Sequence, residues 1–143
     1  MALHQLIYVS QATKPMSSGE LFDLVEVSKR NNHPHDITGQ LLYNSGVFMQ
    51  VLEGEKDEIV KLYERIKLDE RHHDVEVLYL EPANYRIFDG WSMNMFNLDV
   101  DTPSQANTLR AIIKNATNHL QEVRLSAPLQ LLRVFTAPPS IHS

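Results

Sequence analysis

The amino-acid sequence predicts an α+β domain, in which one sheet carries two helices on one face and a helical tail on the other. Short apolar segments rich in β-branched residues alternate with two segments whose apolar residues recur at helical spacing. The last third of the chain continues the helical spacing. The length of 143 residues suits one such domain with a short extension, and is too small for two ordinary domains.

A strand and a helix are expected at the start of the chain. Residues 3–9 are apolar and β-branched enough for a buried strand. Ser17 and Glu20 have the spacing of a capping box, in which each side chain binds the other residue's backbone N–H. The inward face of the helix continues to Ser28. The helix should end before Pro34, because the residue before a proline avoids the helical conformation.

The middle of the chain predicts two pairs of strands around a second helix. Residues 37–43 and 47–53 have strand character and flank an Asn-Ser-Gly turn, which indicates a hairpin. Over residues 59–66 the apolar side chains recur at helical spacing. Residues 75–80 and 91–97 are the remaining strands, and a loop joins them.

The tail is predicted to be helical. Pro103 suits the first position of a helix. The apolar stripe of this helix comprises Leu109, Ile112, Ile113, Ala116, Leu120 and Val123. A last short helix is expected near residues 128–135, and the Pro138-Pro139 end should be loose.

The predicted order of elements is strand–helix–strand–strand–helix–strand–strand, followed by helices. This order is the ferredoxin-like βαββαβ pattern with one added strand. We therefore expect a ferredoxin-like domain over residues 1–98 and a C-terminal helical extension over residues 99–143. The two main helices should lie on one face of the sheet, and the extension should cover the other face with its apolar stripe.

Charge and composition exclude several classes of protein. The net charge is −5 and no run of Lys and Arg occurs, so nucleic-acid binding is not expected. There is no cysteine, which excludes disulfides, zinc–cysteine sites and thiol nucleophiles. No apolar stretch reaches the roughly 18 residues that a membrane span needs, and the N-terminus lacks the features of a secretory signal. We therefore expect a cytoplasmic protein without membrane association.

Gln50 is out of place in an otherwise apolar strand. Strand alternation puts Phe48, Gln50 and Leu52 on one face of the hairpin. A buried amide group without a partner costs about 1–3 kcal/mol, so something polar should meet Gln50. Tyr8, with Leu6 on one face of the first strand, is a second polar group on a strand expected to be buried.

The first helix turns polar toward its C-terminal end, where Ser28, Asn31 and Asn32 follow its apolar residues. Arg65 and Asp69 stand near the end of the second helix. On the premise that the first and third strands are parallel, both polar ends would flank one slot between the two helices.

Leu24 and Ile66 would form apolar walls of this slot, and Tyr8 with Gln50 its floor. An apolar cleft with a few convergent polar groups is the usual form of a ligand site. A planar ring with alternating carbonyl and N–H groups would suit it.

Other interpretations of these residues stay open at this point. A tyrosine on a strand is most often a core residue, two asparagines before a proline most often end a helix, and Trp91 and Met93 most often fill a core. A colourless ferredoxin-like regulatory domain, which binds a small ligand or a partner, is one alternative. A metal-dependent hydrolase is the other, from the residue types of His33, His35, Asp36, His72 and His73.

Six segments taken in order resemble the BLUF family of blue-light receptors, which use flavin. They are LIYVS around Tyr8, the region from Ser28 to Asn32, ITGQLLY, VFMQVLEG, DERHHDVEVL and FDGWSM. The resemblance covers residues 3–98 with similar spacing throughout, and is to the short, stand-alone members. The family is α+β and ferredoxin-like, in agreement with the order of elements.

The resemblance implies roles for individual residues. Tyr8 would donate an electron and a proton to the excited flavin, and Gln50 would rearrange its hydrogen bonds between Tyr8 and the ring. Trp91 and Met93 would form the fifth-strand pair that relays the change. Glu70 departs from the family, which often has proline there. The implied flavin-binding residues are Tyr8, Leu24, Ser28, Asn31, Asn32, Phe48, Gln50, Arg65, Ile66, Asp69, Arg71 and His72.

FAD is the cofactor that the resemblance implies. The five glycines have neither dinucleotide nor P-loop spacing, so the adenine end should be held loosely and FMN could replace FAD. We expect a non-enzymatic photoreceptor without a metal site, which acts through a downstream protein partner and forms a homo-oligomer. Colour separates this hypothesis from both alternatives, because only a bound flavin makes the purified protein yellow.

Overall fold

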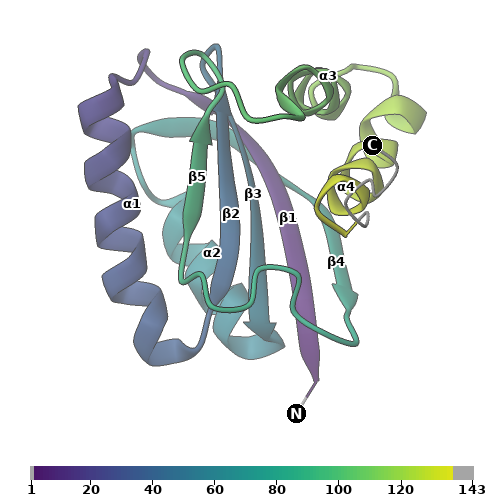
Figure 1. Cartoon of the computed structure of the whole chain (residues 1–143). Coiled ribbons are helices and arrows are strands. Elements are labelled where there is room, and N and C mark those ends of the chain that lie inside the picture. Colours follow the sequence, from purple (N-terminus) through teal and green to yellow (C-terminus); the bar gives the residue numbers. More distant parts are fainter. Residues whose placement is uncertain (1, 137–143) are drawn as a thin grey trace.

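The sheet of the computed structural model has five strands in the order β4-β1-β3-β2-β5 (Figure 1). β2 and β5 are parallel, and the other neighbouring strands are antiparallel. The structure describes residues 2–136. The strands are β1 (Leu3–Ala12), β2 (Thr38–Asn44), β3 (Val47–Glu55), β4 (His72–Pro82) and β5 (Asn94–Asn97). This mixed sheet with its helices confirms the predicted α+β, ferredoxin-like fold.

Helices cover both faces of the sheet (Figure 1). One face carries α1 (Ser18–Asn32), the 3-10 helix η1 (His33–His35) and α2 (Lys56–Lys67). The other face carries α3 (Ala106–Ala116) and α4 (Gln121–Thr136), as predicted for the tail. Because both faces are covered, the strands bury side chains on each side and form two separate apolar cores.

The start and end of α1 follow from local chemistry. Ser17 Oγ accepts a hydrogen bond from Glu20 N at 3.1 Å, and Glu20 Oε1 accepts one from Ser17 N at 3.0 Å. This is the capping box that the sequence predicts. The helix ends at Asn32, and Pro34 lies in the single turn of η1 that follows it.

The hairpin between β2 and β3 has the tight turn that Asn-Ser-Gly indicates. Ser45 and Gly46 both have positive φ, at 48° and 81°. Two successive positive φ angles define a type I′ turn, whose twist matches that of the flanking strands. The turn fixes the register in which Leu41 pairs with Gln50.

The premise that the first and third strands are parallel is wrong. β1 and β3 are antiparallel neighbours, with Tyr8 directly opposite Gln50. The helices that follow these strands therefore run in opposite directions, and their C-terminal ends lie at opposite ends of the helical layer (Figure 1). Strand directions are set by which strands become neighbours in the sheet, and the order along the chain does not specify that.

The tail helices differ from the predicted ones in their bounds. The apolar stripe does not continue to Val123, because α3 ends at Ala116 and Leu120 is 55% exposed between the helices. Asn118 Oδ1 accepts a hydrogen bond from Leu120 N at 2.8 Å, which stabilises a turn at this point. Pro103 precedes α3 and is not its first residue, and the Pro138-Pro139 segment lies outside the described residues.

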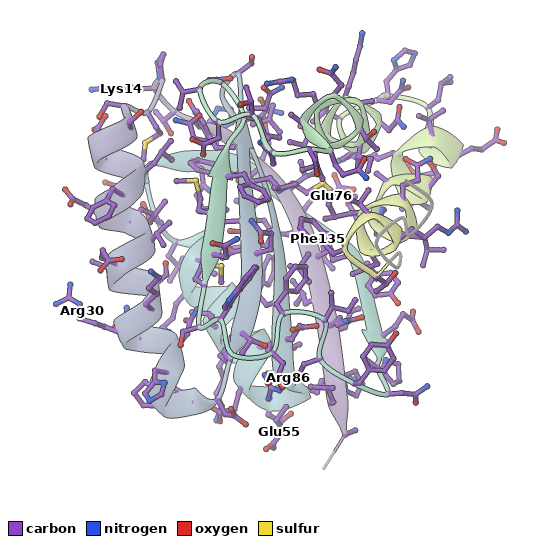
Figure 2. All side chains as sticks on the ribbon, in the orientation of Figure 1. Lys14, Arg30, Glu55, Glu76, Arg86 and Phe135 are labelled. Atoms are coloured by element: carbon purple, nitrogen blue, oxygen red, sulfur yellow. The ribbon has the colours of Figure 1, made fainter. Side chains whose placement is uncertain are left out.

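α4 begins at Gln121, earlier than the predicted start near residue 128, and Pro128 lies inside it. Leu131 and Ala127 of this helix are fully buried against the sheet. Phe135 lies over the sheet (Figure 2), where its ring contacts those of Phe88 at 5.0 Å and Phe96 at 6.5 Å between centroids. The domain boundary at residue 98 stays a prediction, since the tail and the sheet share this core.

β5 is shorter than the predicted strand over residues 91–97. Its ladder with β2 begins at Asn94, opposite Gln40. Gly90 has a φ of 87°, and Trp91 N donates to Phe88 O at 3.1 Å, so the chain is still turning at residue 91. Trp91 therefore precedes the strand, and its side chain is 50% exposed.

Candidate functional site

A cavity of about 240 Å³ lies between α1, α2 and the sheet. All twelve residues that the sequence implicated in flavin binding line it, from both helices, β1, β3 and the segment before β4. The two polar helix ends thus reach one cavity from opposite ends rather than from one rim. The cavity is also lined by four residues that were not predicted, Met16, Val27, Leu41 and Leu62.

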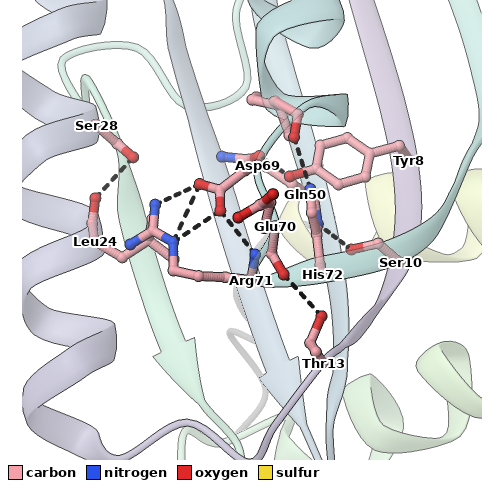
Figure 3. A network of polar contacts seen from close by, with 11 residues as sticks. Tyr8, Ser10, Thr13, Leu24, Ser28, Gln50, Asp69, Glu70, Arg71 and His72 are labelled. Atoms are coloured by element: carbon pink, nitrogen blue, oxygen red, sulfur yellow. Dashed lines mark hydrogen bonds and ion pairs between the residues drawn. The ribbon is translucent and has the colours of Figure 1, made fainter.

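Tyr8 and Gln50 form the floor of the cavity and are hydrogen-bonded to each other (Figure 3). The Tyr8 hydroxyl donates to Gln50 Oε1 at 2.5 Å, and both side chains are nearly fully buried. Gln50 Nε2 donates to Met93 Sδ at 3.2 Å. Because a thioether sulfur is a weak acceptor, this side of the amide is only weakly held, and it borders the cavity.

Burial raises the pKa of the Tyr8 phenol, and the nearby Tyr63 and Asp69 add to the effect. Desolvation disfavours the charged phenolate, so Tyr8 stays protonated at physiological pH. A protonated hydroxyl can donate the hydrogen bond to Gln50 Oε1 that the geometry shows.

His72 connects three elements beside Tyr8 (Figure 3). Its Nε2 lies 2.7 Å from Ile66 O, and its Nδ1 lies 2.8 Å from Ser10 Oγ. A carbonyl oxygen can only accept, so Nε2 carries the proton, and in the neutral ring Nδ1 accepts from the Ser10 hydroxyl. The ring is edge-on to those of Tyr8 and Phe48, at centroid distances of 6.4 and 6.2 Å. His72 thus orients the aromatic wall of the cavity.

Asp69 and Arg71 form a charged pair at the cavity (Figure 3). Arg71 Nη2 donates to Asp69 Oδ2 at 2.5 Å and Arg71 Nε donates to Oδ1 at 2.9 Å. The side-chain hydrogen bond from Arg71 lowers the pKa of Asp69. Thr13 Oγ1 donates to Glu70 O at 2.9 Å, so the residue just after β1 holds this segment in place although glutamate replaces the proline common in the family.

The polar end of α1 contributes groups of different kinds. Asn32 is buried, and its Nδ2 donates to Ser92 O at 3.0 Å, which ties α1 to the segment before β5. Ser28 donates its hydroxyl to Leu24 O at 2.9 Å, so it offers only acceptor lone pairs to a ligand. Asn31 is exposed and lines the cavity.

Of the expected fifth-strand pair, Met93 reaches the site and Trp91 does not. Met93 is 1% exposed and contacts Gln50. Neither Met93 nor Trp91 is among the residues that line the cavity, so Met93 reaches the site through its contact with Gln50. The expectation that both residues lie on one strand face is wrong, because the strand begins only at Asn94.

Two of the four missed residues had a signal in the sequence. Leu62 lies one turn before Ile66 on the same helical face, and Leu41 pairs with Gln50 across the hairpin. Met16 lies in the connection between β1 and α1, where no periodic pattern exists. Its backbone N–H donates to the Tyr43 hydroxyl at 3.0 Å, a contact that only the folded structure reveals.

The cavity fits a flavin ring in its chemistry. Leu24, Ile66 and Phe48 offer apolar surface. The Gln50 amide, whose NH₂ group is bound only to the weak sulfur acceptor of Met93, offers an N–H at the floor. Asn31 offers both a donor and an acceptor. Such a set suits a flat ring with polar atoms along its edge, which matches the isoalloxazine ring.

Residues 3–94 match the family model described as BLUF, sensors of blue-light using FAD. The chain therefore belongs to the BLUF family, and the resemblance noted in the sequence is confirmed. It is a blue-light sensor domain that binds a flavin.

Three similar proteins illustrate the relation. Photoactivated adenylate cyclase subunit beta of Euglena gracilis is 42% identical over 138 residues, which cover 94% of this chain and 16% of that protein. A bacterial light-regulated adenylyl cyclase of known structure is 33% identical with a TM-score of 0.73, over 80% of this chain and 34% of that one. BlrB, a BLUF protein solved in the dark state, is 27% identical with a TM-score of 0.71, over 94% and 92%. The chain thus spans about a sixth of the curated cyclase relative.

The histidines behind the metal-hydrolase alternative are dispersed. His72 lines the cavity, and His35 lies 2.7 Å from Glu58 on the outside. Within residues 2–136, no three His, Asp or Glu side chains gather in a way that could hold a metal ion. Over the same residues, no helix combines the length and apolar character that crossing a membrane requires.

Proposed function

We propose that this chain is a photoreceptor whose light response is carried by Tyr8 and Gln50, and which signals through another protein rather than by enzymatic activity of its own. The observation that carries the proposal is the 2.5 Å hydrogen bond from the Tyr8 hydroxyl to Gln50 Oε1 at the floor of the cavity. Two buried polar groups that partner each other beside a ring-sized cavity are suited to respond together to a change at the ring.

The ligand that we propose is FAD, with FMN able to occupy the same ring site. Asn31, Asn32 and Ser28 would hold one polar edge of the ring, and Arg65 with the Asp69–Arg71 pair would hold the other edge and the ribityl chain. When bound, the flavin supplies the absorption of blue light and a transient acceptor for one electron.

Tyr8 is the electron and proton donor. Because burial raises its pKa, loss of the proton alone would leave a desolvated phenolate, which is unfavourable. Tyr8 therefore gives up the proton together with an electron. Gln50 Oε1, at 2.5 Å, would take up that proton while the bound flavin takes the electron, and both would return to Tyr8 once the amide has rearranged.

Gln50 converts this transfer into a lasting change. Once Gln50 Oε1 carries the proton, it donates rather than accepts, so the dark hydrogen bond with Tyr8 is lost and the side chain of Gln50 rearranges to recover hydrogen bonds. Its Nε2 is held only by the sulfur of Met93, so rearrangement changes the contact to the segment before β5. With the flavin bound, a new hydrogen bond donated by the Gln50 amide to the ring would shift the absorption to the red.

The output passes to a separate protein. In photoactivated adenylate cyclase subunit beta of Euglena gracilis, the region similar to this chain makes up 16% of the protein. We propose a cytoplasmic homo-oligomer that binds a downstream partner. Leu125 and Leu129, half-exposed and one turn apart on α4, supply apolar surface for such contacts.

The test is spectroscopic. The purified protein should be yellow and should release FAD, FMN or both on denaturation. Blue light should shift its flavin absorption reversibly to the red. A colourless preparation that does not take up added flavin, or a yellow one without a shift, would contradict the proposal.

A further inference from the structure

The connection between β4 and β5 crosses the whole sheet. Residues 83–93, called here the crossover segment, lead from β4 at one edge to β5 at the other, across the face that carries α3 and α4 (Figure 1). Ala83 N donates to Leu3 O at 2.9 Å at its start. Phe88, near its middle, is 2% exposed. Ile87 beside it is partly buried, so the backbone N–H groups at this point of the segment need partners.

Glu53 supplies those partners from the central strand β3. Its side chain is completely buried, and each carboxylate oxygen accepts two hydrogen bonds. Ile87 N donates to Oε2 at 2.7 Å, and Phe88 N donates to Oε1 at 2.9 Å. Gln5 Nε2 and Thr38 Oγ1, from the two flanking strands, donate at 2.9 Å each. Four donors saturate the acceptor capacity of an ionised carboxylate.

Arg86 supplies the countercharge to Glu53 indirectly. Arg86 Nη1 donates to Thr38 Oγ1 at 2.9 Å and to Glu53 O at 3.2 Å. Thr38 therefore accepts from Arg86 and donates to the Glu53 carboxylate. Arg86 Nη2 also donates to Asp36 at 3.1 Å (Figure 2 labels Arg86). The middle of the crossover segment is thus fixed to the sheet by charged groups and by two of its own N–H groups.

The other end of the crossover segment lies at the light-sensing site. Trp91 O accepts from Gly39 N at 3.1 Å, Ser92 O accepts from Asn32 Nδ2 at 3.0 Å, and Met93 Sδ accepts from Gln50 Nε2 at 3.2 Å. Trp91 N in turn donates to Phe88 O at 3.1 Å. Only four residues separate Phe88, held by Glu53, from Met93, held by Gln50.

We propose that Glu53 is a positioning residue that anchors the crossover segment and so keeps Met93 against Gln50 in the dark, and that light weakens the hold of this anchor. The part of the inference that concerns light rests on the proposed function. When Gln50 rearranges, its hydrogen bond to Met93 Sδ is lost and Met93 can shift. The resulting strain passes back along the crossover segment to Ile87 N and Phe88 N, which Glu53 holds. The Glu53 carboxylate resists this displacement because the two backbone N–H groups would each give up a hydrogen bond to a buried charged group.

Glu53→Gln tests the anchor in the dark by amide hydrogen exchange. An amide has one acceptor oxygen, so in either orientation its NH₂ group faces Ile87 N or Phe88 N and one of these bonds is lost. Loss of a hydrogen bond to a charged group should raise exchange at that N–H by about tenfold or more. Glu55→Gln, two residues along the same strand on a side chain that is only partly buried, is the matched control and should leave exchange unchanged.

Amide exchange under blue light tests whether light weakens the anchor. In the wild type, exchange at residues 87 and 88 should rise on illumination, whereas Glu53→Gln should start from the raised level and show little further rise, with its red shift retained. Wild-type exchange at residues 87 and 88 in dark Glu53→Gln would overturn the anchor. If exchange in β1 rose as much as exchange at residues 87 and 88, Glu53 would stabilise the whole domain rather than the crossover segment. That result would also overturn the proposed anchor.

A third variant covers failure of Glu53→Gln to fold. Thr38→Val removes one donor to Glu53 and the acceptor of Arg86 while keeping the shape of the side chain. It should raise exchange at residues 87 and 88 in the same direction, and no change would overturn the anchor. A wild type without a red shift would contradict the proposed function, whereas the dark comparison of Glu53→Gln with Glu55→Gln would still decide the role of Glu53.

Discussion

A buried amide is stable when its carbonyl and its N–H groups find partners, and Gln50 finds them in Tyr8 and Met93. The two partners differ in strength. The Tyr8 hydroxyl is a good donor at 2.5 Å, whereas the Met93 sulfur is a weak acceptor at 3.2 Å. Any loss of the Tyr8 bond therefore leaves the amide with little to hold its orientation, which is the property that a hydrogen-bond switch needs.

Tyr8→Phe should keep the flavin and abolish the red shift. The ring packing survives, and only the hydroxyl that supplies the proton and the hydrogen bond is lost. Gln50 Oε1 is left without its donor, so the free energy of unfolding should fall by about 1–3 kcal/mol. Absorption spectra before and after blue light, with urea unfolding in the dark, measure both effects. A normal photocycle in this variant would show that Tyr8 is not the donor.

Gln50→Leu should fold and bind flavin but show no persistent red shift. Leucine is close in volume to glutamine and removes the amide donor and acceptor together. Trp91 is the single tryptophan, and its fluorescence reports on the crossover segment next to Met93. We expect this fluorescence to change on illumination in the wild type and to stay constant in Gln50→Leu. A reversible red shift in the variant would mean that the amide is not the switch.

The sequence could indicate Gln50 and Tyr8 because each is a polar group on a strand whose neighbours are apolar. It could not indicate that Met93 rather than Trp91 reaches the amide. Strand alternation puts residues 91 and 93 on the same face, but the positive φ of Gly90 and the hydrogen bond from Trp91 N to Phe88 O keep residue 91 in a turn. That difference depends on tertiary contacts.

At the scale of elements, the tail shows where periodicity misleads. Leu120 and Val123 continue the apolar spacing of α3, yet the chain turns at Asn118, whose side chain accepts a hydrogen bond from Leu120 N. Apolar residues at helical spacing indicate which face of a helix is buried, but not where the helix ends. A local hydrogen bond from a side chain to the backbone can end the helix while the apolar spacing continues. The last helix was predicted too short, near residues 128–135, whereas α4 begins at Gln121 and continues through Pro128.

Leu131→Ala should weaken the packing of α4 on the sheet. Leu131 is fully buried in the core that the tail shares with the sheet, and such truncations cost about 2–5 kcal/mol. Leu120→Ala, at a side chain that is 55% exposed between α3 and α4, should change stability by no more than about 0.5 kcal/mol. Urea unfolding followed by circular dichroism gives both values. Equal effects of the two substitutions would contradict the observed packing.

Across the whole molecule, one sheet separates the cavity beneath α1 and α2 from the tail. β3 presents Phe48 and Gln50 to the cavity side and Met49 and Val51 to the tail side. The order of elements predicted this layering, because two faces of one sheet need two covers. It did not predict that β1 and β3 are antiparallel, or that the crossover segment spans the tail face.

A structural change at Gln50 must therefore be transmitted from one face of the sheet to the other before it can affect the tail. The contacts of β5 with α4 can transmit it. Met93 contacts Gln50 on the cavity side, while Phe96 of β5 and Phe88 pack against Phe135 of α4 on the other. Illumination should raise amide exchange in β5 and in the last turns of α4, and should leave the central part of β1 unchanged.

The measurement compares exchange in the dark and under continuous blue light, in the wild type and in Tyr8→Phe. Tyr8→Phe is the matched control, because it absorbs the same light but should not rearrange Gln50. Size-exclusion chromatography under the same illumination tests whether the assembly changes as well. Identical dark and lit exchange in β5 and α4 of a wild type that shows the red shift would place the output on another surface. If illumination raised exchange in β5 and α4 equally in Tyr8→Phe, the rise would reflect heating or photodamage. The proposed route of the signal through Phe135 would then be contradicted.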